Sequence, residues 1–336
     1  MKNLNFKNYL KVPVLIISAS LVFGACKKEE EEDMTGNGGS NNNQNMESMT
    51  YNYEFNNGQV VASAPYSGAH MDNLTASMMV EEMGANETKI SVTITNTVNG
   101  ETYHIHAHDA ADPADTPNGT PYNETPNGDV FSQMATGNGG EVTVTQTISM
   151  SYSDITSDYE GFFVVHDPLQ GISTTDISTY LVVGLFAREQ GETNYSSSTF
   201  NYDFNTGQVD AAFEYDGAHA SNLSAMLKIQ ELAEGSRVSV VLMNSLSGEM
   251  YMVHAHDMAD PNDTPNGTPY DETPNGDVLS LMIEGNGGNA HMSQTSSMSY
   301  NNLTSMYEAF FVVHDPLQAI STTDPTTYVI LGVFAD

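Results

Sequence analysis

The sequence predicts an all-β fold, with two tandem Greek-key β-sandwich domains that follow a signal peptide and a disordered tether. Two observations predict it. The body of the chain is a tandem duplication with a period of about 148 residues, and each copy contains short runs of alternating apolar and polar residues between turn residues. No stretch shows a convincing 3.6-residue period. Seven or eight short strands per copy, in segments of this size, are typical of a Greek-key sandwich.

The first residues indicate a signal peptide. Lys2, Lys7 and Lys11 flank or precede an apolar run over residues 12–23, which is shorter than the roughly 20 apolar residues that a membrane helix needs. Two small residues then precede Cys26, the single cysteine. This arrangement resembles the lipobox of bacterial lipoproteins, which implies a signal peptide over residues 1–25 and acylation of Cys26. The alternative is an ordinary signal peptide with a chance cysteine.

Residues 26–50 are expected to form an acidic tether rich in glycine and asparagine. The segment KKEEEED (27–33) resembles the export tag of surface-displayed lipoproteins in some Gram-negative bacteria. We therefore expect an outer-membrane lipoprotein that is exposed at the cell surface and contacts the membrane through lipidated Cys26. No other cysteine is present, so no intrachain disulfide can stabilise the domains, and their stability must come from core burial.

The charge of the chain is strongly negative. The formal net charge is −34, and because the lysines and acidic residues of residues 1–33 cancel, all of it lies on residues 34–336. Such a surface repels nucleic acid and anionic membranes and concentrates cations. The simplest interpretation is solubility. The charge argues against a nucleic-acid partner.

The duplication defines the expected domains. NYEFNNGQV recurs as NYDFNTGQV, DTPNGTPYNETPNGDV recurs as DTPNGTPYDETPNGDV, and FFVVHDPLQ recurs unchanged. Two copies of this length indicate paired domains, not a solenoid. We expect one sandwich over residues 51–188 and another over residues 199–336, joined by a polar link.

Each copy contains recognisable strand signals. In the first copy, residues 89–98 and 141–149 alternate apolar and polar residues, and residues 162–166 and 179–187 are short apolar runs. Asn99-Gly100 lies between the run 89–98 and the next alternating run. An Asn-Gly pair in this position predicts a β-hairpin.

Histidines recur at matching places in both copies. YHIHAHDAADP begins at Tyr103 and YMVHAHDMADP begins at Tyr251. Because side chains alternate along a strand, His106 and His108 point to one face, roughly 6.5–7 Å apart. A later run ending in VVH adds another imidazole. The shared positions are His70 with His219, His106 with His254, His108 with His256, and His166 with His314.

These shared histidines are the candidate metal ligands. Three nitrogens from the His-X-His and VVH strands, with His70 or a water as a fourth ligand, suit copper or zinc better than calcium or magnesium, and copper binds tightest in the divalent series. His104, and Met252 that replaces it in the second copy, are candidate extra ligands. The alternative is that the histidines are satisfied polar residues at one end of a sandwich.

The acidic loops offer a second, less favoured site. Oxygen ligands for calcium are available in both copies, but their spacing is not that of an EF-hand, and the Asp-Pro and Asn-Gly pairs are typical of turn-rich loops. The residues concerned are Asp112, Asp115 and Asn118, with Asp260, Asp263 and Asn266.

The order of these motifs resembles the CHRD domain family and the related Cu,Zn superoxide dismutase sandwich. The resemblance covers nearly the full length of each copy and rests on the His-X-His strand, the VVH strand and a closing strand that contains Gly184 or Gly332. It implies copper ligands at His106, His108 and His166, and at His254, His256 and His314.

The chain also departs from the dismutase pattern. The loop over residues 111–129 has no histidine where the dismutase has its bridging and zinc histidines, although Asp129 and Asp277 match the zinc aspartate, and no subloop disulfide can form. Tyr180 and Tyr328 fall where the arginine that guides superoxide is expected. We therefore do not expect efficient dismutation, and we assign no catalytic residue.

Together these features predict a surface-anchored lipoprotein whose two CHRD-like domains each bind copper, or another transition metal, for metal capture or redox defence. One alternative is a metal-free interaction or adhesion module that uses the acidic loops as its contact surface. Another is a copper-only enzyme similar to superoxide dismutase. The sequence names no protein partner.

Overall fold

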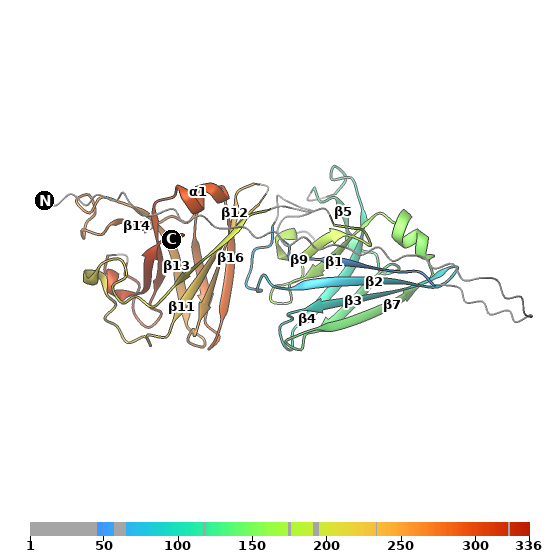
Figure 1. Ribbon diagram of the computed structural model, residues 1–336, viewed down its shortest axis with the longest axis horizontal. Coiled ribbons are helices and arrows are strands. Elements are labelled where there is room, and N and C mark those ends of the chain that lie inside the picture. The colour runs from blue at the N-terminus through green and yellow to red at the C-terminus, as the bar shows by residue number, and fades with distance from the viewer. Residues whose placement is uncertain are drawn as a thin grey trace, which may run out of the picture. The chain divides into compact units, whose positions relative to one another are not determined.

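The computed structural model describes most of the duplicated body of the chain. Among the described residues, each copy contributes nine strands, at least one more than expected, and all the strand pairs are antiparallel (Figure 1). The described residues are 46–56, 65–116, 119–173, 176–190, 195–232, 234–321 and 323–336.

The first copy is a sandwich of two sheets. One sheet has the order β1-β2-β3-β7, and in the other β5 and β6 both pair with β4, which is followed by β8 and β9. In sequence order the strands are β1 (Ser48–Tyr53), β2 (Thr75–Gly84), β3 (Glu87–Thr95), β4 (Thr102–Ala110), β5 (Tyr122–Pro126), β6 (Ser132–Thr136), β7 (Val142–Ile148), β8 (Gly161–His166) and β9 (Tyr180–Leu185).

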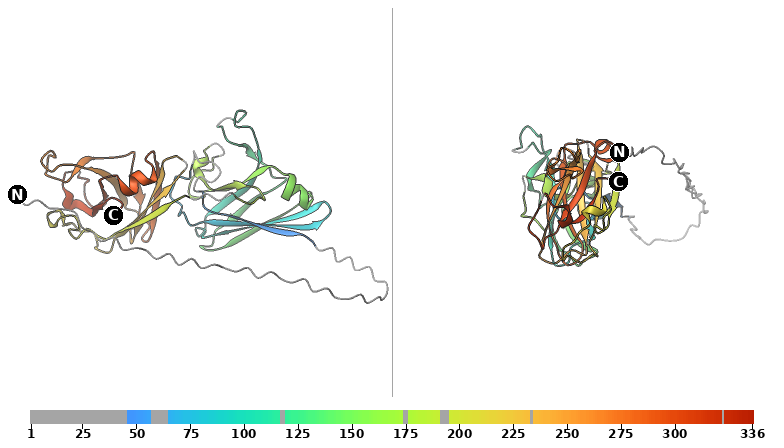
Figure 2. Two further views of the ribbon diagram at one scale, coloured as in Figure 1. Left: turned by 45° about the horizontal axis from the view of Figure 1, so that its top comes forward. Right: turned by 90° about the vertical axis from the view of Figure 1, so that its left-hand side faces the viewer.

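The second copy repeats this topology, with sheets β10-β11-β12-β16 and β14-β13-β17-β18, and with β15 paired to β13. Figure 2 shows the strands of the two copies from two further directions. The strands are β10 (Ser197–Tyr202), β11 (Ser224–Glu231), β12 (Ser236–Met243), β13 (Met250–Met258), β14 (Tyr270–Pro274), β15 (Ser280–Glu284), β16 (Ala290–Ser296), β17 (Ala309–His314) and β18 (Tyr328–Val333).

In the part of the chain that the structure describes, helical structure is confined to short turns. The longest pieces are α1 (Tyr300–Ser305) in the second copy and, at the equivalent place in the first, a π-helical turn over Asp154–Asp158. Shorter 3₁₀ turns precede the closing strands, at Ile177–Thr179 and Pro325–Thr327. Elements of one or two turns leave no 3.6-residue pattern to detect, which explains why the sequence does not reveal them. Among the described residues, none of the helices has the length and apolar character required to span a membrane.

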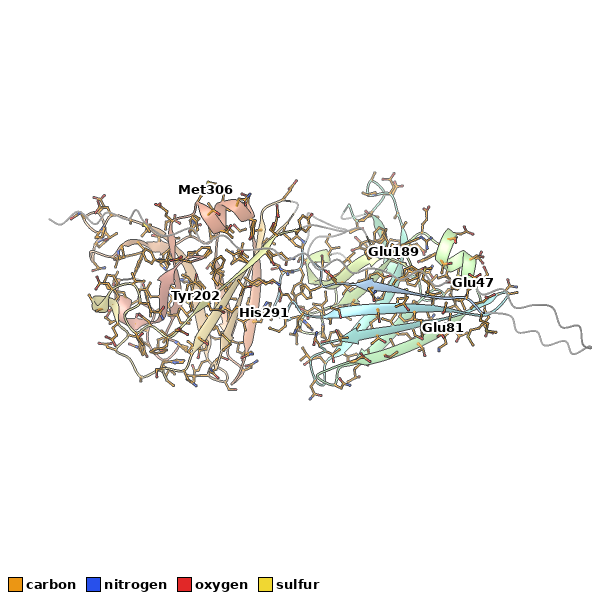
Figure 3. All side chains as sticks on the ribbon, viewed as in Figure 1. Glu47, Glu81, Glu189, Tyr202, His291 and Met306 are labelled. Carbon is orange, nitrogen blue, oxygen red and sulfur yellow. The ribbon has the colours of Figure 1, made fainter. Side chains whose placement is uncertain are left out.

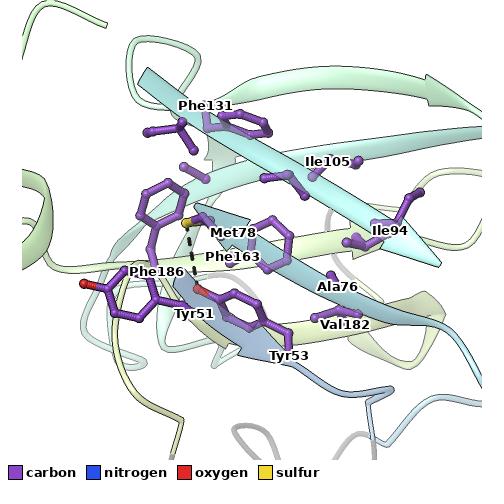
Figure 4. Packing of buried hydrophobic residues seen from close by; sticks show 14 of the residues in the cluster. Tyr51, Tyr53, Ala76, Met78, Ile94, Ile105, Phe131, Phe163, Val182 and Phe186 are labelled. Carbon is purple, nitrogen blue, oxygen red and sulfur yellow. Dashed lines mark hydrogen bonds between the residues drawn. The ribbon is translucent and has the colours of Figure 1, made fainter. Parts of the chain in front are cut away.

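The core of each copy lies between its two sheets. In the first copy Met78 and Val80 of β2 face Ile105 of β4 and Phe163 of β8 across the sandwich, and the Tyr53 hydroxyl contacts the Met78 sulfur at 3.9 Å (Figure 4). Burial of each such side chain contributes roughly 1.5–3 kcal/mol. Alternating residues of every inner strand supply this core, so the period of two seen in the sequence directly predicts which side chains pack there.

The hairpin expected at Asn99-Gly100 is not formed, although the chain does turn there. β3 pairs with β2 and β7, whereas β4 pairs with strands of the opposite sheet. Gly100 takes a positive φ of 85°, but its N–H donates to the carbonyl of Gly137 at 2.9 Å, in the 137–140 loop. The prediction was wrong because the turn connects the two sheets, and its polar groups bond to a neighbouring loop in place of a partner strand.

The domain limits expected from the duplication differ slightly from the strands observed. β1 begins at Ser48, inside the segment assigned to the tether, and β10 begins at Ser197. The predicted signal peptide, Cys26 and residues 26–45 lie outside the described residues. Acidic side chains such as Glu47 and Glu189 are exposed (Figure 3), as a chain with this negative charge leads one to expect.

Candidate metal centres

β4 presents two different sets of side chains on its two faces. Tyr103 and Ile105 are buried in the core between the sheets, whereas His106 and His108 lie on the opposite face. This separation follows from the alternation of side chains along a strand. The histidines are therefore placed on the face of the five-stranded sheet that points away from the main core.

The register between β4 and β8 brings a third histidine to the same place. His106 lies opposite Val164, two residues before His166, so His166 is a diagonal neighbour of His106 on the same face, with their ring centroids 5.3 Å apart. The centroids of His106 and His108 are 6.0 Å apart. One nitrogen from each of the three rings lies within 4.8 Å of the others. The three imidazoles form a cluster that could hold a metal ion.

The rings of this cluster carry buried nitrogens that have no hydrogen-bond partner. Nδ1 of His108 donates to the backbone carbonyl of Asn123 at 2.8 Å, and because a carbonyl can only accept, the proton is on Nδ1. Its buried Nε2 therefore carries a lone pair, and no hydrogen-bond donor contacts it. Both nitrogens of His166 and Nδ1 of His106 are also buried without a partner. Buried polar atoms are normally hydrogen-bonded, so this set of orphaned nitrogens indicates an absent ligand.

Burial keeps these rings neutral. Desolvation, with a smaller contribution from His108, lowers the pKa of His106 from its ordinary value near 6.5 to about 4. Desolvation, followed by repulsion from His106, lowers the pKa of His166 to about 3. A metal binds the neutral form of imidazole, so at neutral pH no proton has to leave before a metal binds.

The second copy repeats the cluster. One nitrogen each from His254, His256 and His314 lies within 4.8 Å of the others. Nδ1 of His256 donates to the carbonyl of Asp271 at 2.8 Å, and its Nε2 is buried without a partner, as are both nitrogens of His314. Desolvation lowers the pKa of His254 to about 4 and that of His314 to about 3.

A pair of tyrosines completes the surroundings of each triad. In the first copy Tyr122 packs against His108 and Tyr180 packs against His166, with centroid separations of 5.4 and 4.5 Å. Both rings are fully buried, and neither hydroxyl completes a hydrogen bond of standard geometry. Burial, chiefly, raises the pKa of Tyr180 to about 12. Tyr270 and Tyr328 have the same places in the second copy.

No family model matches this chain, and no curated protein matches it. Among solved structures, the crystal structure of red sea bream transglutaminase covers 74% of this chain at 8% sequence identity, with a TM-score of 0.17. The match covers 30% of the length of that protein chain. A similarity this low carries no argument, so the site must be interpreted from its own geometry.

His70 and His219, expected as fourth ligands, lie in a separate hydrogen-bond network. Nδ1 of His70 donates to the carbonyl of Met71, and its Nε2 accepts from the Tyr103 hydroxyl, both at 2.8 Å. That hydroxyl in turn accepts the N–H of Val98 at 2.7 Å. His219 makes the equivalent bonds to Ala220 and Tyr251. Both nitrogens of each ring are already used, which corrects their assignment as metal ligands.

The candidate extra ligands flank the triads. The ring of His104 lies 6.0 Å from that of His106, measured between centroids, and Met252 lies on the same face of β13 as His254. In the acidic loops, carboxylates close turns: Asp112 accepts the N–H of Ala114, and Asp260 accepts that of Asn262, both at 2.9 Å. Asn118 lies outside the described residues.

Two features of the site are absent from the sequence interpretation. The sequence does not reveal that Tyr122 packs against His108, or that the carbonyl of Asn123 accepts the hydrogen bond of that ring. Both lie on β5, which follows a long acidic loop and pairs with β4 through an irregular register. The only available signal is the recurrence of a tyrosine in the matching segments PYNETP and PYDETP of the two copies.

Proposed function

We propose that each copy binds one transition-metal ion, with copper the favoured metal, through His106, His108 and His166 in the first and through the equivalent triad in the second. One observation carries the proposal: each triad brings one nitrogen from each of three rings within 4.8 Å of the others, and these rings carry buried nitrogens without a hydrogen-bond partner. Metal-free burial of such nitrogens costs free energy, and a metal ion would satisfy them together.

The chemistry of the ligands supports copper or zinc. Three neutral imidazoles with no carboxylate are poor ligands for calcium and magnesium, which prefer oxygen. In the divalent series the affinity of nitrogen sites is greatest for copper. The negative field of the chain favours the approach of any cation. The resemblance to the CHRD and Cu,Zn superoxide dismutase sandwiches also supports this choice.

The test is the copper content of the purified chain after loading with Cu(II) and removal of excess metal. We expect about two copper ions per chain, one per copy. His106→Gln, which keeps the volume but removes the ligand, should leave one copper, and His106→Gln with His254→Gln should leave none. In the His106→Gln variant, the unaltered second copy is the matched control, because it should still bind its copper. A copper content that does not change in the double variant would contradict the proposal and favour a metal-free interaction module.

We further propose that the protein is an outer-membrane lipoprotein, anchored through acylated Cys26 and exposed at the cell surface, where it captures metal or contributes to redox defence. The sequence around Cys26 and the acidic segment after it support this location. Growth with labelled palmitate should label the protein, and Cys26→Ser should abolish the label. Protease added to intact cells should remove the duplicated body. Retention of label in the Cys26→Ser variant would contradict anchoring at this residue.

A further inference from the structure

Exposed methionines lie beside the histidine triad of the second copy. Met252 on β13 lies directly opposite Met282 on β15, and Met250 lies two residues before Met252 on the same face. Met250 is 43% exposed and Met282 is 55% exposed, whereas Met252 is half-buried. The same face of β13 continues into His254.

The register allows the three thioether sulfurs to converge. Side chains directly opposite each other on antiparallel strands have Cβ atoms about 4.5–5.5 Å apart, and residues i and i+2 are about 6.5–7 Å apart. Methionine has three rotatable bonds beyond Cα and adapts readily to a common contact point. Three such side chains in one corner of a sheet can therefore supply three sulfur ligands to one ion.

Core packing does not explain these methionines. The neighbouring residues Leu281 and Ile283 of β15 face the core of the second copy, so Met282 between them points to the opposite side. Burial of an apolar side chain is the usual reason for a methionine in a strand. Here two of the three are largely exposed, and the carboxylate of Glu284 lies opposite Met250 in the ladder.

The first copy does not have this cluster, although its fold is the same. The residues at the three equivalent positions are Thr102, His104 and Met134, of which only the last is a methionine, and His104 pairs with Met134. The methionine cluster is thus a feature of one corner of this face in the second copy. The cluster lies beside the histidine triad of the second copy, and an equivalent triad is present in the first copy.

We propose that Met250, Met252 and Met282 form a thioether site for a soft monovalent cation, Cu(I) or Ag(I), that only the second copy has. Thioether sulfur is a soft ligand that favours Cu(I) over the divalent ions suited to imidazole. The site goes beyond the proposed function because it uses sulfur ligands and needs none of the histidines. It makes the two copies chemically different.

The test uses Ag(I), which has no redox chemistry under the conditions of the experiment, and the chain labelled with ¹³C at its methionine methyl groups. At low Ag(I) we expect three methyl signals to shift, those assigned to Met250, Met252 and Met282 by single leucine substitutions. The triple variant Met250→Leu, Met252→Leu and Met282→Leu should lose at least about tenfold in Ag(I) affinity. Its Cu(II) content should stay at two ions per chain.

Two controls separate this site from the histidine triads. A variant with leucine at three other exposed methionines, Met83, Met134 and Met306, should keep its Ag(I) affinity. A variant with His254→Gln, His256→Gln and His314→Gln should also keep it. Loss of Ag(I) binding in the histidine variant, or shifts of all exposed methionines in parallel, would overturn the thioether site and leave the proposed Cu(II) centres untouched.

Discussion

At the scale of single residues, the hydrogen bond from His108 to the carbonyl of Asn123 fixes the chemistry of the ring. The carbonyl can only accept, so Nδ1 carries the proton, and Nε2 carries a lone pair that has no hydrogen-bond partner. Metal-binding histidines commonly use a hydrogen bond of this kind to fix tautomer and orientation. His256 and the carbonyl of Asp271 repeat the arrangement, so both copies hold one ring ready for a metal.

The depressed histidine pKa values predict how the stability of the metal-free protein depends on pH. The folded pKa of His166 and His314 is about 3, below the unfolded value of 6.5, so between these pH values the unfolded chain binds protons that the folded chain does not. Lowering the pH from 7 to 5 should therefore reduce the free energy of unfolding, by about 2 kcal/mol per ring. Urea denaturation of the metal-free chain at several pH values measures this.

A variant with His166→Gln and His314→Gln is the control for this pH dependence. Glutamine does not titrate, so the loss of stability between pH 7 and pH 5 should be smaller by the contribution of the two rings. Wild-type protein with the same unfolding free energy at both pH values would show that the rings are not buried in neutral form. Bound metal should raise the free energy of unfolding at both pH values but leave this pH dependence in place, because the folded rings are already neutral and the unfolded chain still takes up the protons.

At the scale of strands, the sequence predicts the features that depend on the alternation of side chains. It does not predict which strands pair with each other when they are distant in sequence. The period of two, together with the matching segments of the two copies, predicts where the strands lie and which face of β4 packs in the core. It also predicts that His106, His108 and His166 lie close together. The prediction of a hairpin at Asn99-Gly100 is wrong, because a turn signal cannot distinguish a turn within a sheet from a connection between sheets.

His70 shows a second limit of sequence interpretation. A histidine shared by both copies is equally consistent with a ligand and with a structural hydrogen bond, and its partners, Met71 and Tyr103, become visible only when the loop is packed against β4. Tyr122 is the opposite case, a contact that the sequence does not predict. It packs against His108 because β5 pairs with β4, and the register of that pairing is irregular. Pairing between segments that are distant in sequence sets both contacts.

At the scale of the whole molecule, the charge decides which small ions approach. The formal net charge is −34, and only four lysines or arginines lie after residue 33: Lys89, Arg188, Lys228 and Arg237. Lys89 forms an ion pair with Glu81 at 2.9 Å. The resulting field attracts metal cations and repels anions over distances set by the ionic strength. Capture of a cation is therefore favoured, and encounter with an anionic substrate is not.

We accordingly expect the copper-loaded protein to have weak or no superoxide dismutase activity. Tyr180, which packs against His166, is uncharged and cannot draw in an anion, and the net charge opposes the approach of superoxide. Any residual activity should increase as salt is added, because salt screens a repulsive field. The measurement is the rate of superoxide decay at low and at physiological ionic strength. Turnover near the diffusion limit that slows with salt would instead identify an enzyme.

The two faces of β4 make this strand respond very differently to two kinds of genetic change. A point substitution alters one face only: where the first copy has His104 the second has Met252, while tyrosine keeps the adjacent core position as Tyr103 and Tyr251. Deletion of a single residue would exchange the faces, drive imidazoles into the core and expel the apolar side chains. Along this strand the fold therefore tolerates substitutions on the outer face, whereas an insertion or deletion disrupts both the core and the histidine cluster.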